Sequence, residues 1–190
     1  MSDSKLVRLR LEAVGDTEHD NLHMITLISD SKERQVIFFT DKYICDQLSI
    51  RFVAPNSSLS RKFLPEVLLK MLKDKSMSLK DDYRIVITAV VDGEYQVVIE
   101  DLASSAAYPI RISDAVLLSY ISEMPLYMRS ELYMRQGVFV LSNTKHNKAV
   151  PVNVIPVEFL EKALQQMIDE ENYRMAKILS DELKRRKKQE

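Results

Sequence analysis

The chain has 190 residues, enough for one domain of about 150 residues and a smaller appendage, with a core that needs no disulfide or metal. Apolar residues make up 46% and charged residues 29%, and the formal charge is −1, so the composition excludes a disordered, collagen-like or strongly basic chain. The single cysteine, Cys45, excludes an intrachain disulfide, and three scattered glycines exclude a glycine-rich phosphate-binding loop.

The first residues and the hydropathy pattern predict a cytoplasmic protein without a membrane segment. Residues 1–15 alternate charged and apolar side chains and lack the apolar run of a secretory signal. Elsewhere no apolar run approaches the roughly 18 residues that indicate a membrane span. A reducing compartment also agrees with the lone cysteine.

The first third of the chain predicts an antiparallel sheet followed by a helix. Val7, Leu9 and Leu11 alternate with charged residues, which indicates a half-buried strand that ends at residues 15–16. Residues 22–28 and 35–39 are two further strands joined by a polar turn. Residues 40–41 suit the cap of the next helix. Its expected inward face consists of Ile44, Cys45, Leu48 and Phe52.

A second helix is expected from about Ser60, with Pro65 in its first turn. Its expected inward residues are Leu64, Val67, Leu68, Met71 and Leu72. Residues 84–91 and 95–99 are apolar and β-branched, and Asp92-Gly93 between them predicts a hairpin.

Two short strands and two helices are expected next. Residues 108–112 form a strand, and Ser113 and Asp114 suit the N-cap and first turn of a helix that runs to about Glu123. Residues 124–128 return as a strand, and residues 130–136 form helical turns stopped by Gly137.

The last part of the chain, residues 158–190, predicts an αα-hairpin that contacts another chain. Its two apolar stripes consist of Phe159, Leu160, Ala163, Leu164, Met167 and Ile168, and of Tyr173, Ala176, Leu179 and Leu183. Each helix is too short to be stable alone in water, so the stripes must be buried. The basic residues 184–188 suit a solvated helix end, and contact with nucleic acid is the alternative.

The predicted fold class is therefore α+β, with a mixed, largely antiparallel sheet, packed helices and a C-terminal αα-hairpin. The expected organisation is a domain at 1–137, a β-rich connector at 138–157 and the hairpin at 158–190.

The segment from Tyr108 to Glu131 resembles the most recognisable part of the bifunctional nuclease family. The residues that carry this resemblance are Arg111, Ser113, Asp114, Ala115, Pro125, Tyr127 and Glu131. The resemblance covers about 130 residues in element order, with specific matches in some thirty of them. It implies action on DNA and RNA and a tendency to self-associate as a homo-oligomer.

The tail, residues 160–183, is similar to the UVR motif, the helical hairpin through which excision-repair nuclease subunits pair. Its acidic turn, followed by Asn172, Tyr173 and Ala176, carries the match. This resemblance implies a protein partner for residues 158–190.

The chain departs from the nuclease family at two places where that family has a carboxylate, a histidine and a second carboxylate. Ile44-Cys45 replaces Glu-Ala in the first helix, and residues 60–62 replace Thr-His-Asp at the start of the second. Two hypotheses therefore remain. One is a metal-assisted nuclease that uses Mg or Mn, and the other is a non-catalytic interaction module that acts through the hairpin.

For the nuclease hypothesis, the candidate catalytic residues are Asp114, Glu131, Arg111 and Ser113, and the candidate metal ligands are Asp114 and Glu131. The alternative reading of Ser113 and Asp114 is ordinary helix capping. Arg111 suits either a phosphate or an ion pair with Asp114 or Glu131, because its guanidinium binds both kinds of oxygen in a bidentate way.

Overall fold

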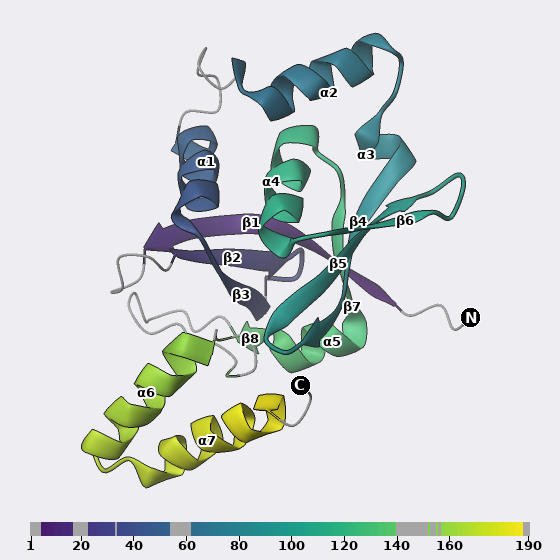
Figure 1. The fold of residues 1–190 in the computed structure, drawn as a ribbon. Helices are drawn as coiled ribbons and strands as arrows, with labels where there is room; N and C mark the ends of the chain where they lie inside the picture. The colour runs from purple at the N-terminus through teal and green to yellow at the C-terminus, as the bar shows by residue number, and fades with distance from the viewer. Residues whose placement is uncertain are drawn as a thin grey trace.

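We describe a computed structural model of the chain, which covers residues 5–16, 23–32, 34–53, 62–139, 152, 155 and 157–187. The predicted α+β fold class is confirmed (Figure 1). The strands are β1 (Leu6–Asp16), β2 (His23–Ser29), β3 (Arg34–Thr40), β4 (Tyr83–Val91), β5 (Glu94–Asp101), β6 (Ala107–Ile110), β7 (Leu126–Arg129) and β8 (Val138–Phe139). The helices are α1 (Lys42–Val53), α2 (Leu64–Asp74), α3 (Leu79–Asp82), α4 (Ile112–Ser122), α5 (Ser130–Gln136), α6 (Val157–Asp169) and α7 (Tyr173–Lys187).

The described strands form one eight-stranded sheet in the order β6-β5-β4-β7-β1-β2-β3-β8. Two antiparallel meanders, β1-β2-β3 and β4-β5-β6, lie on either side of β7. β7 pairs with β1 antiparallel and with β4 parallel. A parallel neighbour requires a crossover connection, which α4 supplies between β6 and β7. The mixed sheet predicted from the sequence is therefore present.

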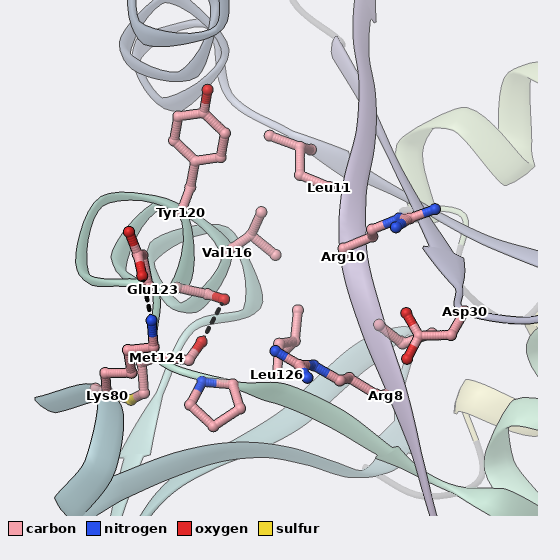
Figure 2. A pocket seen from close by; sticks show the side chains of 13 residues that line it. Arg8, Arg10, Leu11, Asp30, Lys80, Val116, Tyr120, Glu123, Met124 and Leu126 are labelled. Atoms are coloured by element: carbon pink, nitrogen blue, oxygen red, sulfur yellow. Dashed lines mark hydrogen bonds and ion pairs between the residues drawn. The ribbon is translucent and has the colours of Figure 1, made fainter. Parts of the chain in front are cut away.

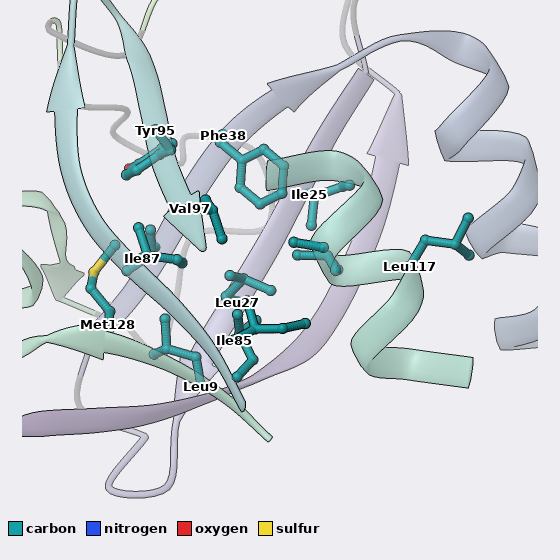
Figure 3. Close-up of a cluster of buried hydrophobic side chains, with 14 of the residues drawn as sticks. Leu9, Ile25, Leu27, Phe38, Ile85, Ile87, Tyr95, Val97, Leu117 and Met128 are labelled. Atoms are coloured by element: carbon teal, nitrogen blue, oxygen red, sulfur yellow. The ribbon is translucent and has the colours of Figure 1, made fainter. Parts of the chain in front are cut away.

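The core lies between one face of the sheet and the helices α1 and α4. Alternate strand residues such as Ile25, Leu27, Ile85 and Ile87 are fully buried, and Figure 3 shows them gathered beneath α4. α1 contacts β1 and β2, and α4 contacts β4 and β5. Each meander is thus covered by the helix that follows it, and the two helices also contact each other.

Local signals placed most of the elements correctly. The turn between β4 and β5 has Asp92 at φ 50° and Gly93 at φ 87°, the pair of positive φ values that a two-residue hairpin requires. The Asp41 carboxylate accepts a hydrogen bond of 2.9 Å from the backbone N–H of Ile44, which caps α1 as expected. Cys45 is buried in the core.

The inward face predicted for α1 was wrong at one position. Phe52 is 44% exposed, whereas Arg51 is 3% exposed. The Arg51 guanidinium donates to both carboxylate oxygens of Glu66, at 2.5 and 2.9 Å, and lies 4.9 Å from the centre of the Phe63 ring. The Arg51–Glu66 ion pair therefore connects α1 to the next helix.

The burial predicted for the second helix was also wrong. α2 has no buried residue, and Leu64 and Met71 are 70% and 58% exposed. α2 contacts α4 and forms an outer layer over it, so its apolar residues do not reach the core of the described structure. Its start at Leu64 lies after the predicted Ser60, which falls outside the described residues, and Pro65 does stand in the first turn.

Residues 138–157 were predicted as a β-rich connector. β8 pairs with β3, and most of the remaining connector lies outside the described residues. The two C-terminal helices are present as α6 and α7, and Leu160, Leu179 and Leu183 are buried where they meet. Among the described helices, none is long and apolar enough to cross a membrane.

Candidate functional site

The four predicted site residues lie at the N-terminal ends of α4 and α5, with Arg111 as the residue before α4. Arg111 and Asp114 form a bidentate ion pair, with 2.8 Å from Nε to Oδ2 and 3.2 Å from Nη2 to Oδ1. This hydrogen bond and the charge of Asp114 raise the pKa of Arg111. Of the two partners expected for Arg111, the structure shows Asp114. Both side chains are at the surface, with 67% and 38% of their areas exposed.

Ser113 does not cap α4, which corrects the sequence interpretation. The N-cap is Arg111, whose extended backbone follows β6 directly and whose carbonyl accepts the N–H of Ala115 at 2.9 Å. Ser113 therefore lies inside the first helical turn, where it is 7% exposed. The register is two residues earlier than predicted because the strand passes into the helix without a turn.

Glu131 is exposed in the first turn of α5. In the part of the chain that the structure describes, Glu131 makes no hydrogen bond or ion pair with Asp114 or Arg111. Within the described ranges, no group of three or more His, Cys, Asp or Glu side chains lies close enough together to hold a metal ion. The structure therefore does not gather Asp114 and Glu131 with a third carboxylate.

The two other carboxylates near this segment have structural partners. Glu100 accepts a hydrogen bond of 2.6 Å from Nε of Arg84 on the neighbouring strand. Asp101 accepts hydrogen bonds from the Ser104 hydroxyl and from the backbone N–H groups of Ser104 and Ala103, which lower its pKa. Glu100 therefore links β5 to β4, and Asp101 stabilises the turn between β5 and β6.

A pocket of about 540 Å³ lies elsewhere, between β1, the C-terminal end of α4 and the start of β7. β7 pairs with β1 only as far as Leu9, opposite Leu126, whereas β1 continues to Asp16. From Arg10 onward this edge of β1 therefore has no strand partner in the described sheet. The register of β1 also shifts between Leu11 and Ala13, and such bulges redirect neighbouring side chains.

The pocket carries charge at its margin and apolar surface inside. Figure 2 shows Arg8 reaching into the pocket, Arg10 and Asp30 at the side of β1, and Lys80 against Glu123. The apolar wall includes Leu11, Val116, Tyr120, Met124 and Leu126. Sequence reasoning missed this site. Its only signal was Arg8 and Arg10 at alternate positions of the first strand, which any solvent-facing strand also shows.

The α6–α7 hairpin is fixed at its base by a buried arginine. Arg186 is 5% exposed and donates to the Ile155 carbonyl at 2.8 Å and to the Glu182 carboxylate at 2.8 Å. Hydrogen bonds from Arg185 and Arg186 lower the pKa of Glu182 to about 2. A Cβ at Gly93 would lie 2.6 Å from Nη1 of Arg186, so the guanidinium packs on the β4–β5 turn.

The outer surface of the hairpin is charged and partly apolar. Residues 157–171 contain five carboxylates and one lysine, a charge of −4, and residues 173–187 contain six cations and two carboxylates, a charge of +4. Tyr173, Met175 and Ile178 are 67%, 41% and 46% exposed on α7. Such a surface can form both charge pairs and apolar contacts with a partner.

Comparison with known proteins gives no further assignment, because no protein-family model and no curated protein sequence matches this chain.

Proposed function

We propose that this protein is a non-catalytic interaction module whose α6–α7 hairpin pairs with the hairpin of a second copy. The observation that carries the proposal is the opposite charge of the two halves of the hairpin, −4 over α6 and the turn after it (157–171) and +4 over α7 (173–187). An isologous contact about a two-fold axis places α6 of each copy against α7 of the other. Acidic and basic surfaces then meet twice in the same dimer.

Apolar side chains add to this pairing. Met175 and Ile178 are spaced three residues apart on α7, about a quarter turn from the buried Leu179 and Leu183. Burying two such side chains contributes about 1.5 to 3 kcal/mol each at full burial. Long-range charge attraction speeds and orients the encounter, and the apolar contact slows dissociation.

Charge-swapped variants test the proposal. Glu158→Lys with Glu161→Lys changes the charge of residues 157–171 from −4 to 0, and Lys177→Glu with Lys184→Glu changes that of residues 173–187 from +4 to 0; all four wild-type side chains are exposed. Each variant alone is expected to dimerise at least about tenfold more weakly than wild type, because one of the two opposite charges that attract each other is gone. Mixing the two variants is expected to restore part of the dimer, since the −4 segment of one variant then meets the +4 segment of the other and the two neutral segments meet each other.

The readout is the dimer dissociation constant from analytical ultracentrifugation, with far-UV circular dichroism to check that α6 and α7 stay helical. A matched control reverses two exposed charges on α1 and α2, which lie away from the hairpin in Figure 1, Lys42→Glu and Lys70→Glu. The proposal fails if the wild-type protein is still monomeric at about 0.1 mM, which is about 100 times a dimer dissociation constant of about 1 μM. It also fails if the mixture behaves like the separate variants.

As a second candidate, we propose metal-assisted hydrolysis of DNA or RNA phosphodiesters with Mg or Mn. The resemblance of residues 108–131 to the bifunctional nuclease family supports it, as does the solvent access of Asp114. This candidate requires Asp114 and Glu131 to come together around the metal, which they do not do in the structure, and Arg111 to leave Asp114 and bind a phosphate. Cleavage of single- and double-stranded DNA and RNA is compared with an Asp114→Ala variant, and equal activity of the two proteins rejects this candidate.

A further inference from the structure

The pocket beside β1 holds a positive charge that the described protein does not neutralise. Lys80 and Glu123 pair at 2.5 Å, so their charges offset each other. Arg8 and Arg10 are exposed, and neither guanidinium makes a hydrogen bond or ion pair with a residue that the structure describes. Asp30 contributes one opposing charge, which leaves +1 for the five charged side chains that line the pocket.

Arg8 is the cation best placed to meet a ligand. In Figure 2 its side chain extends from β1 into the pocket, on the side of Lys80, whereas Arg10 extends to the opposite side of β1, toward Asp30. The Glu123 hydrogen bond raises the pKa of Lys80, and the charge of Arg8 opposes that effect, so the two cations share one electrostatic environment. An anion between Arg8 and Lys80 would offset the repulsion between these two cations, and Lys80 would keep its contact with Glu123.

The other side of the pocket is apolar. Tyr120, Val116 and Leu11 lie above Arg8 in Figure 2, on α4 and β1. The Tyr120 hydroxyl donates to the Arg51 carbonyl at 3.4 Å and so points away from the pocket. The pocket is therefore lined by the apolar ring of Tyr120 and not by its hydroxyl. A volume of about 540 Å³ is within the range of small-molecule sites.

We propose that this pocket binds a phosphate ester of nucleotide size. Arg8 and Lys80 hold its single phosphate, and its planar organic part lies against Tyr120, Val116 and Leu11. A guanidinium matches two phosphate oxygens at once, and an aromatic ring matches a planar base. The carboxylates of Asp30 and Glu123 disfavour a diphosphate or triphosphate, because the pocket offers only one unbalanced positive charge. The inference does not depend on pairing of the hairpins.

Titration calorimetry and amide NMR shifts on the full chain test this proposal, with AMP, adenosine and inorganic phosphate as probes. We expect saturable AMP binding that shifts the Arg8 and Lys80 amides, weaker phosphate binding, and at least about tenfold weaker binding of adenosine. Arg8→Gln should weaken AMP binding at least about tenfold, and Arg10→Gln about two- to threefold. Arg135→Gln is the matched control, because it removes one exposed arginine outside the pocket.

Tyr120→Leu separates the two parts of the ligand, since it should weaken AMP binding and leave phosphate binding unchanged. A 5′-phosphorylated tetranucleotide identifies the source of the phosphate ester. Tighter binding than AMP supports the end of a nucleic-acid strand, and equal or weaker binding supports a free nucleotide. The proposal is overturned if AMP and adenosine bind alike, if Arg8→Gln and Arg135→Gln have equal effects, or if the wild-type Arg8 and Lys80 amides do not shift with AMP.

Discussion

The sheet with its helices and the C-terminal hairpin are held together in different ways. In the sheet, buried side chains from most described strands meet α1, α4 and α5 in one cluster. In the hairpin, the buried apolar cluster consists of Leu160, Leu179 and Leu183, and the charged Arg186 is buried beside it. Apolar burial involves no group that titrates, whereas a buried charge is stabilised only while its partner is also charged. The hairpin should therefore open first, and acid should act on it selectively.

The largest expected effect tests the core of the sheet. Ile85 is fully buried in β4, and Ile85→Ala should lower the free energy of unfolding by about 3 to 4 kcal/mol, because it leaves a cavity. Val91→Ala, on the same strand at 49% exposure, is the control and should cost less than about 1 kcal/mol. Denaturant unfolding measures both, and equal losses would contradict the burial described for β4.

The next effect concerns the anchor of the hairpin. Arg186→Ala leaves the Ile155 carbonyl without its donor and removes one partner of Glu182, so it should cost about 3 kcal/mol. Hydrogen exchange should rise across residues 157–187 and stay low in β4 and β7. The exposed Lys187→Ala is the control. If exchange rises equally in the sheet, the hairpin and the domain unfold as one unit.

Acid should weaken the same anchor. The pKa of Glu182 is about 2 in the folded protein, below its ordinary value of 4.5, so its stabilising contribution is complete above about pH 5. That contribution is lost as the pH falls from about 5 to 2, and it amounts to about 2 kcal/mol after allowance for solvent screening. Helix content against pH is compared with Glu182→Gln, which should lack this part of the acid dependence; superimposable curves would reject the role of Glu182.

The smallest effect tests the contact between the two regions. Gly93→Ala forces a side chain into a positive φ and against Arg186, so it should cost about 1 to 2 kcal/mol. It should also raise hydrogen exchange in α7. Gly15→Ala meets nothing within 4 Å and should change stability by less than about 0.5 kcal/mol. An unchanged α7 in Gly93→Ala would mean that the turn does not support the hairpin.

Sequence patterns predicted the positions of the helices and strands better than they predicted which side chains are buried and which elements pack together. The α2 stripe was correctly helical, but it lies outside the core because α2 packs on α4 rather than on the sheet. Arg51 is buried where Phe52 was expected, because Glu66 supplies a bidentate partner from α2. The pairing of Arg111 with Asp114 was one of the anticipated alternatives, since residues three apart meet on a helix. The pocket was not anticipated.

The sequence by itself determined the strand alternation of β1, the Asp92-Gly93 turn and the amphipathic helices α6 and α7, because these depend on neighbours within a few residues. Only the tertiary structure decided the place of β7 between β1 and β4 and the point at which its pairing with β1 ends. That register joins residues more than a hundred positions apart. Because this pairing ends at Leu9, the edge of β1 is open from Arg10 onward, and the charged pocket lies there. The pocket therefore depends on contacts that no local pattern encodes.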